Sequence, residues 1–222
     1  MVSLMENIKE INELIRLSRK VAKYKFNIGV SYSFLIYGSS FASFSIIALS
    51  IKTTSYLMFM IVLISTIVLA GIFAIYLINR LFSAGFRVLT IEIESQIKIK
   101  RGFMSFLYFI IPPAIVYFIL GILALNDWLP YAIAWYPSLG FSLILGDLTH
   151  FKKLYEKGYL VSRPFLESGV SILISFVILY FLLFLGLIIR DLFPIALSGA
   201  CLLVYMITAI RTTILAEKIF EE

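Results

Sequence analysis

The chain has 222 residues, of which 61% are hydrophobic and only 14% are charged. A soluble domain is about half apolar and about a quarter charged, so this composition excludes an ordinary water-soluble domain and indicates a protein embedded in lipid. The formal net charge of +6 is explained by membrane topology and needs no nucleic-acid partner.

Apolar residues recur at helical spacing in the N-terminal segment, residues 1–25, with charged residues opposite them. The apolar set is Leu4, Ile8, Ile11, Leu14, Ile15 and Val21. This period predicts an amphipathic helix. Because a basic stretch leads directly into the first apolar run, we expect the helix to lie in the cytoplasmic interface as an elbow before that run. The alternative is a cytosolic helix that packs on another protein, since both placements need the same stripe.

Six uncharged runs follow, and each is long enough to cross a bilayer once. They cover residues 26–51, 53–79, 102–126, 128–146, 168–189 and 192–210. About 20 residues, each rising ~1.5 Å along a helix, cross the ~30 Å hydrocarbon core. Strands are excluded, because a barrel would show alternating segments of about ten residues.

We therefore predict an all-α fold, a polytopic transmembrane bundle of six spans arranged as three hairpins. The six-helix domain covers residues 26–213 and a cytoplasmic tail covers 214–222. The expected spans are about 27–51, 55–79, 103–126, 128–146, 168–189 and 192–211.

Lys and Arg residues are distributed unevenly among the connecting segments. Of the 19 in the chain, 17 lie in the N-terminal segment, in 80–101, in 152–163 and in the C-terminal segment, whereas only Lys52 and Arg190 lie in the other loops. The positive-inside rule assigns the basic side to the cytoplasm. We therefore expect a multi-pass protein of the cell membrane with both termini cytoplasmic, whose basic segments also attract anionic lipid.

Two long inner loops, residues 80–102 and 147–167, would offer most of the surface that a cytoplasmic partner such as an ATPase could reach. The candidate docking residues are Arg80, Arg87, Lys98, Lys100, Arg101, Lys152, Lys153 and Lys157. Within the first loop, Leu89–Lys100 alternates apolar and polar residues as a strand does. Because Leu89, Ile93 and Ile97 also share one helical face, we expect a cytoplasmic helix there.

Prolines interrupt two of the apolar runs at similar depth, about nine or ten residues from their cytoplasmic ends and therefore near the membrane midplane. Interrupted neighbouring helices free backbone carbonyls, which is typical of a transporter's binding site. The alternative is ordinary proline kinking. The candidate binding or pathway residues are Pro112, Pro113, Trp135, Tyr136, Pro137, Ser138 and Ser142.

Small residues also recur at a spacing of four, and such stripes let lipid-embedded helices approach closely. The candidate packing residues are Ser39 and Ser43 in the first span and Ser138, Ser142 and Gly146 in the fourth. Packing is the favoured interpretation. The alternative is that these hydroxyl groups line a polar path.

The runs contain no ionisable Asp, Glu, Lys or Arg, which counts against proton-coupled carriers and intramembrane aspartyl proteases. His150 is the single histidine, and it could share a helical face with Asp147 in a metal or acid–base site. We favour instead a residue at a helix end, where partial positive charge suits the helix dipole. No phosphate-binding loop, zinc spacing or haem-attachment motif is present. We therefore predict no enzymatic activity, no catalytic residues, no metal and no cofactor.

The polarity pattern favours a transport or permease-type subunit that carries no chemistry of its own and is driven by a separate cytoplasmic partner. The alternative is a structural or assembly subunit of a larger membrane complex, whose small-residue stripes pack against other spans. Both interpretations leave homo-oligomerisation open. The sequence does not indicate a substrate.

Overall fold

The computed structural model describes residues 2–51, 103–123 and 128–221, together with Ile61, Ser65, Leu69, Ile72 and Tyr76. Within this part of the chain the secondary structure is helical and contains no strand, so the predicted all-α class is confirmed. The helical elements are α1 (Val2–Ile51), α3 (Phe103–Ile122), α4 (Trp128–Ile133), α5 (Trp135–Gly146), the π-helical turn η1 (Asp147–Phe151), α6 (Lys152–Glu156), α7 (Pro164–Phe184), the 3-10 turn η2 (Arg190–Leu192), α8 (Phe193–Glu217) and the 3-10 turn η3 (Lys218–Phe220).

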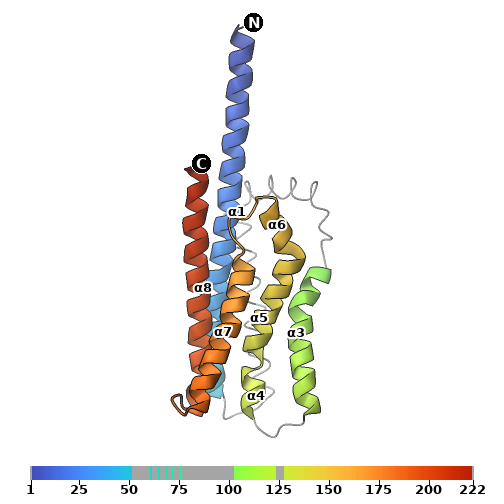
Figure 1. Ribbon diagram of the computed structural model, residues 1–222, viewed down its shortest axis with the longest axis vertical. Helices are drawn as coiled ribbons and strands as arrows, with labels where there is room; N and C mark the ends of the chain where they lie inside the picture. The colour runs from blue at the N-terminus through green and yellow to red at the C-terminus, as the bar shows by residue number, and fades with distance from the viewer. Residues whose placement is uncertain are drawn as a thin grey trace.

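The long helices lie side by side as a bundle with two distinct ends (Figure 1). Both chain termini and α6 lie at one end, which we call the terminal end, whereas α4 and the α7–α8 connection lie at the opposite end. Helix α1 packs along α8, α5 packs between α3 and α7, and α7 also contacts α8. The N-terminal part of α1 projects beyond the bundle at the terminal end.

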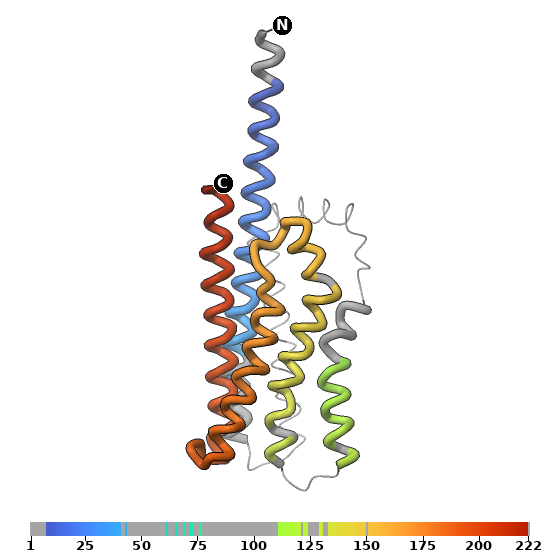
Figure 2. Tube along the Cα trace, in the orientation of Figure 1, coloured from blue at the N-terminus to red at the C-terminus, as the bar shows by residue number. Residues whose placement is uncertain are grey.

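Helix α1 runs without interruption from Val2 to Ile51, as the tube in Figure 2 shows for its described part. The expected elbow near residue 25 is therefore absent. The sequence has no proline or glycine before Gly29 that would favour a kink. Ala22, Phe26 and Asn27 are instead buried against the bundle, which continues the helix straight through the predicted boundary.

Two stretches of the described chain, Pro164–Phe184 and Arg190–Phe220, are long and apolar enough to cross a bilayer, and they overlap the predicted fifth and sixth spans. They are therefore compatible with membrane insertion. Helix α7 begins and ends earlier than the expected span, 168–189. Helix α8 continues to Glu217, into the segment 214–222 that was expected to be a tail.

The early end of α7 has a local cause in a glycine cap. Gly186 follows the helix with φ +71°, its N–H donates to the carbonyl of Leu183 (3.0 Å), and the N–H of Leu187 donates to the carbonyl of Leu182 (3.0 Å). This left-handed cap satisfies the last carbonyls and turns the chain away from the helix axis. Gly158, with φ +73°, ends α6 in the same way.

The predicted fourth span, 128–146, is divided at Ala134 into α4 and α5. Pro137 explains the position of the break, because its missing N–H and its ring disturb the bond to the carbonyl of residue 133. In contrast, α3 continues through Pro112 and Pro113, so the expected break in the third span is absent from the described helix. Most of the second span, 55–79, and the inner loop 80–102 lie outside the described residues.

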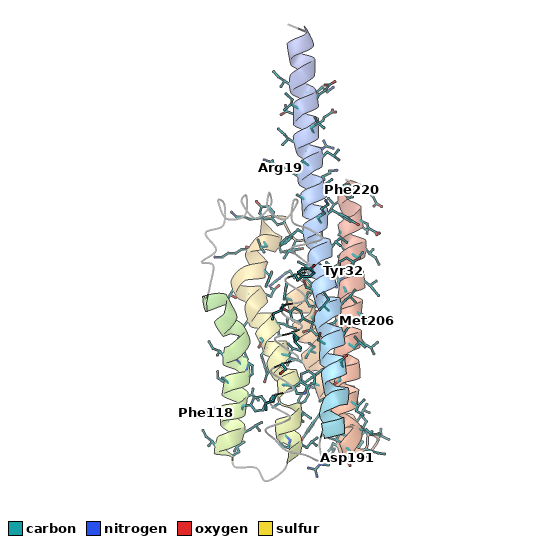
Figure 3. The ribbon with its side chains drawn as sticks, turned by 180° about the vertical axis from the view of Figure 1, so that it is seen from behind. Arg19, Tyr32, Phe118, Asp191, Met206 and Phe220 are labelled. Atoms are coloured by element: carbon teal, nitrogen blue, oxygen red, sulfur yellow. The ribbon has the colours of Figure 1, made fainter. Side chains whose placement is uncertain are left out.

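Many large apolar side chains are exposed along the described sides of the bundle, and aliphatic and aromatic side chains fill its core. Tyr136, Phe193 and Leu197 are completely buried in the main core. On the outside, Phe118 of α3 and Met206 of α8 point away from the bundle on opposite sides (Figure 3). The large apolar side chains that α7 exposes are Val170, Ile174, Val177, Ile178, Tyr180, Phe181 and Phe184.

Candidate functional site

The segment 147–163, which we call the cap, closes the terminal end of the bundle between α5 and α7. Helix α5 passes directly into the π-helical turn η1, which is a rare geometry that often marks functional positions. After α6 the Gly158 turn sends the chain back toward α7, which starts at Pro164 in the first helical turn, where proline is favoured.

The cap has an apolar underside that packs on α1. Leu154, Tyr159 and Leu160 are buried against Ala22 and Phe26 of α1. The contact between Leu154 and Tyr159 also belongs to the glycine cap, because an apolar pair commonly accompanies this motif. The turn after α6 is therefore held by side-chain packing as well as by its backbone.

The side chain of Asn27, completely buried on α1, makes three hydrogen bonds, two of them to the cap. Its Nδ2 donates to the carbonyls of Tyr159 (2.9 Å) and of Lys23 in its own helix (2.9 Å), while its Oδ1 accepts the N–H of Val161 (3.0 Å). One amide thus satisfies two backbone groups of the irregular segment after α6. Leaving such groups unpaired in the interior would cost about 1–3 kcal/mol each.

Asp147, also completely buried, forms an ion pair with Arg163 across the cap. The Nε of Arg163 donates to Asp147 Oδ2 (2.9 Å), and its Nη2 donates to the same oxygen. Within the described chain, Asp147 Oδ1 has no hydrogen-bond partner, and neither does the buried Ser162 Oγ. Burying an acidic group is costly unless a partner charge offsets its desolvation, so Arg163 is required where Asp147 lies.

A layer of polar contacts beneath the cap joins α1, α7 and α8. Ser31 Oγ donates to the carbonyl of Ala209 (2.7 Å) and lies 2.8 Å from Thr213 Oγ1. Ser168 Oγ donates to Thr208 Oγ1 (3.0 Å). Short hydroxyl contacts of this kind allow helices to associate closely without burying unpaired polar atoms.

The outward surface of the cap is basic. Lys152, Lys153 and Lys157 are exposed on and directly after α6, and Tyr155 between them is also exposed. Lys152 forms an exposed ion pair with Glu156 (3.7 Å). The structure thus brings together three of the predicted docking residues, whereas Arg80, Arg87, Lys98, Lys100 and Arg101 lie outside the described residues.

The residues predicted to form a midplane site lie on α3 and α5, two helices that pack against each other. Pro112, Trp135, Tyr136, Ser138 and Ser142 are buried, while Pro113 and Pro137 are partly buried.

Hydrogen bonds use two of these side chains within the bundle. Tyr136 Oη lies 2.7 Å from Ser175 Oγ of α7, and Ser138 Oγ donates to the carbonyl of Ala134 (2.6 Å). The break at Ala134 lies ~9 Å from the start of α4 and ~20 Å from Asp147 along the helix, so it is nearer the α4 end than the middle.

The residues predicted to pack helices have different environments. Ser138, Ser142 and Gly146 are buried within this chain, whereas Ser39 and Ser43 are exposed on α1. A close helix approach within the described chain involves two glycines that were not among the predicted packing residues. A Cβ on Gly140 would lie 3.1 Å from the carbonyl oxygen of Gly169, and a Cβ on Gly169 would lie 2.7 Å from that of Gly140.

Sequence reasoning also missed the roles of Asn27, Asp147 and Arg163. Asn27 and Asp147 lie at or just beyond the end of an apolar run, which is a detectable signal for an interfacial polar residue, whereas Arg163 lies inside the inner loop 147–167. Their pairing was not detectable, because the partners are separated by 16 residues in one case and by more than 130 in the other. Within the described part of the chain no three His, Cys, Asp or Glu residues gather as metal ligands, and the side chain of His150 lies outside it.

No protein family, curated protein or solved structure matches this chain.

Proposed function

We propose that this chain is a multi-pass membrane protein with six spans and both termini in the cytoplasm, and that it acts as a transport-type subunit driven by a cytoplasmic partner. The apolar exterior supports the membrane location. A water-soluble monomer rarely exposes a contiguous apolar patch of more than a few hundred Å², whereas α7 alone exposes apolar residues along nearly its whole length.

The positions of the charged residues support the proposed orientation. Arg19 of α1 lies beside the terminal end near Phe220, and Asp191 lies at the opposite end (Figure 3). The basic residues of α1 between Arg16 and Lys25 and those of α6 therefore gather at the terminal end. By the positive-inside rule this end is cytoplasmic.

The observation that carries the functional proposal is the construction of the cap. Its underside is fixed by two hydrogen bonds from Asn27 and by the buried Asp147–Arg163 ion pair, while its outer surface presents exposed lysines. A rigid element transmits a partner's movement to the helices that it joins, and the cap joins α5 directly to α7. The three lysines favour an acidic surface on the partner.

The interrupted helix gives this subunit a place at which a substrate could bind. Pro137 leaves the carbonyl of residue 133 without an amide donor at the usual position, next to the buried Tyr136 and Ser138. Discontinuous helices commonly form the binding sites of transporters. This break lies on α5, which is the same helix that the cap extends.

The test compares charge reversal on the cap with the same number of reversals elsewhere. In the cap variant, Lys152, Lys153 and Lys157 are replaced by Glu. In the control, Lys9, Arg16 and Lys20, which lie on the far side of α1, are replaced by Glu. The wild-type chain and the control should copurify from mild detergent with a second polypeptide in fixed proportion and with ATPase activity, and the cap variant should lose both.

Three outcomes would contradict the proposal. Recovery of a lone monomer from every variant, without ATPase activity or a bound small molecule, would remove the driven-subunit function. Equal retention of the partner by the cap variant and the control would remove the cap as its docking surface. A stable complex that lacks ATPase activity and transport would favour the structural-subunit function instead.

A further inference from the structure

Helix α1 leaves the bundle at a defined point. The ring of Tyr24 contacts that of Phe220 in η3, just after α8 (centroids 5.2 Å apart). Ala22 is the residue nearest the N-terminus that α1 buries against the cap. Toward the N-terminus, residues 8–19 are all exposed. At ~1.5 Å per residue, the projecting part extends ~30 Å beyond Ala22.

Three isoleucines form an apolar stripe on this projecting part. Ile8, Ile11 and Ile15 have 51%, 55% and 49% of their surface exposed. With about 100° of rotation per residue, all three lie within about 40° of the direction of Ala22. The isoleucine stripe is therefore the continuation of the face that α1 buries against Leu154 and Tyr159 of the cap.

The spacing of the stripe is that of a helix that pairs with another helix. Ile8, Ile11, Ile15, Ser18 and Ala22 follow the alternating intervals of three and four residues that define the seam of a coiled coil. Two of these positions, Ile11 and Ile15, are flanked by Asn12 and Leu14, which carry no charge. Leu14 and Leu17, which are 65% and 53% exposed, widen the apolar surface on one side of this seam.

We propose that the isoleucine stripe binds an amphipathic helix of a cytoplasmic partner, seated above the cap and carrying acidic residues at its membrane-proximal end. This inference rests on the proposed function, which requires such a partner, and it identifies the element that the partner contributes. The helix would lie along α1 with its end toward the cap, so that it covers the three isoleucines.

Charge supports this occupant. Arg19 flanks the lower end of the stripe, and Lys152, Lys153 and Lys157 lie on the nearby cap. The acidic residues Glu10 and Glu13 lie about 120–180° away from the stripe, on the far side of α1. The surroundings of the stripe near the membrane are therefore basic, which favours an acidic partner segment.

The same geometry disfavours two other occupants. The base of this face of α1 is already covered by Leu154 and Tyr159 of the same chain. A second copy related by a two-fold axis would bring its own cap to the same face, where the two caps would compete for space. A lipid surface would require the projecting helix to bend into the interface, whereas α1 continues straight past Ala22 and turns its stripe toward the space above the cap.

The experiment places a photo-crosslinking amino acid at Ile11 or at Ile15 of the full chain in the membranes of cells that express it. The matched control places the same amino acid at Glu13, which is on the opposite side of α1. We expect one discrete protein adduct from each stripe position and none from Glu13. The crosslinked peptide should be sequenced and should be an amphipathic helix with acidic residues at one end.

A second variant tests the apolar contact without crosslinking. Ile11→Asp should abolish recovery of this partner, while Lys9→Asp, on the far side of α1, should retain it. Ile11 is exposed in the free chain, so both variants should insert and fold as the wild type does.

The proposal would be overturned by an adduct that consists of two copies of this chain, by an adduct with phospholipid, by equal crosslinking from Glu13, or by the absence of any adduct. These results are separable from the test of the cap. If the cap variant retains the partner and the Ile11 adduct persists, the stripe is correct and the cap surface is not. If the cap variant loses the partner but Ile11 gives no adduct, the cap is the docking surface and the stripe is not.

Discussion

Gly140 of α5 and Gly169 of α7 bring the backbones of their helices into direct contact. A Cβ on Gly169 would lie 2.7 Å from the carbonyl oxygen of Gly140 and 2.7 Å from Cγ1 of Ile144. Real Cβ atoms essentially never approach other atoms so closely, so the helices would have to separate to accept a side chain. This crossing lies between the cap and the Tyr136–Ser175 hydrogen bond, and it makes α5 and α7 one packed unit.

Gly169→Ala should therefore destabilise the protein, and Gly199→Ala should not. Overpacking of this kind costs about 1–3 kcal/mol. A Cβ on Gly199 of α8 would meet no atom within 4 Å, so this control gains only the helix propensity of alanine. Unfolding of the two variants in detergent measures the difference. Equal unfolding midpoints would contradict the close crossing.

Asn27→Ala should loosen the cap more than removal of a hydrogen bond within a single helix does. The substitution removes the partners of the Tyr159 carbonyl and the Val161 N–H, which should lower the free energy of unfolding by about 2–4 kcal/mol. It should also speed tryptic cleavage after Lys157, which is exposed next to Gly158. Ser33→Ala is the control, because Ser33 Oγ donates to the carbonyl of Gly29 within its own helix. Similar cleavage rates in the two variants would show that Asn27 does not hold the cap.

The Asp147–Arg163 ion pair should show strong coupling in a double-mutant cycle. Asp147→Asn or Arg163→Gln alone leaves a charge without its partner, and breaking a buried pair costs about 3–5 kcal/mol. The double variant should lose much less than the sum of the single variants. The exposed Lys152–Glu156 pair is the control and should couple by less than about 1 kcal/mol. Additive losses at Asp147 and Arg163 would mean that the pair does not form.

Two equally exposed residues distinguish lipid from water around α7. Val177, near the middle of α7, is 67% exposed, and Leu187, in the turn after it, is 70% exposed. Val177→Arg should make insertion of this helix less favourable by about 3 kcal/mol. Leu187→Arg should have little effect, because its side chain reaches water. The inserted fraction of each variant measures this difference, and equal fractions would place α7 in water.

The sequence predicted the all-α fold and the approximate positions of α7 and α8, because long uncharged runs have few alternatives. Element ends were harder to predict where backbone geometry decided them. Gly186 ends α7 within a run that continues to residue 189, and Pro137 divides the fourth run at Ala134 rather than at the proline itself. In α1, the basic residues before Phe26 suggested a bend, but the packing of Ala22 and Phe26 continues the helix.

The candidate site was predictable only in part. The basic character of Lys152, Lys153 and Lys157 is visible in the sequence, and these residues do share one exposed surface. The interactions that hold this surface in place join distant parts of the chain, such as Asn27 with Tyr159 and Val161. No local pattern specifies such pairs, since each depends on how the helices pack.

The most direct test of the account is cysteine labelling of the two ends of the bundle in intact cells. Single cysteines at Lys157 and at Asp191 are introduced into a Cys201→Ser parent, because Cys201 is the single native cysteine. An impermeant maleimide should label Asp191→Cys in intact cells and should label Lys157→Cys only after permeabilisation. Labelling of Lys157→Cys from outside, or release of the chain from membranes by alkaline carbonate, would contradict the proposed membrane topology.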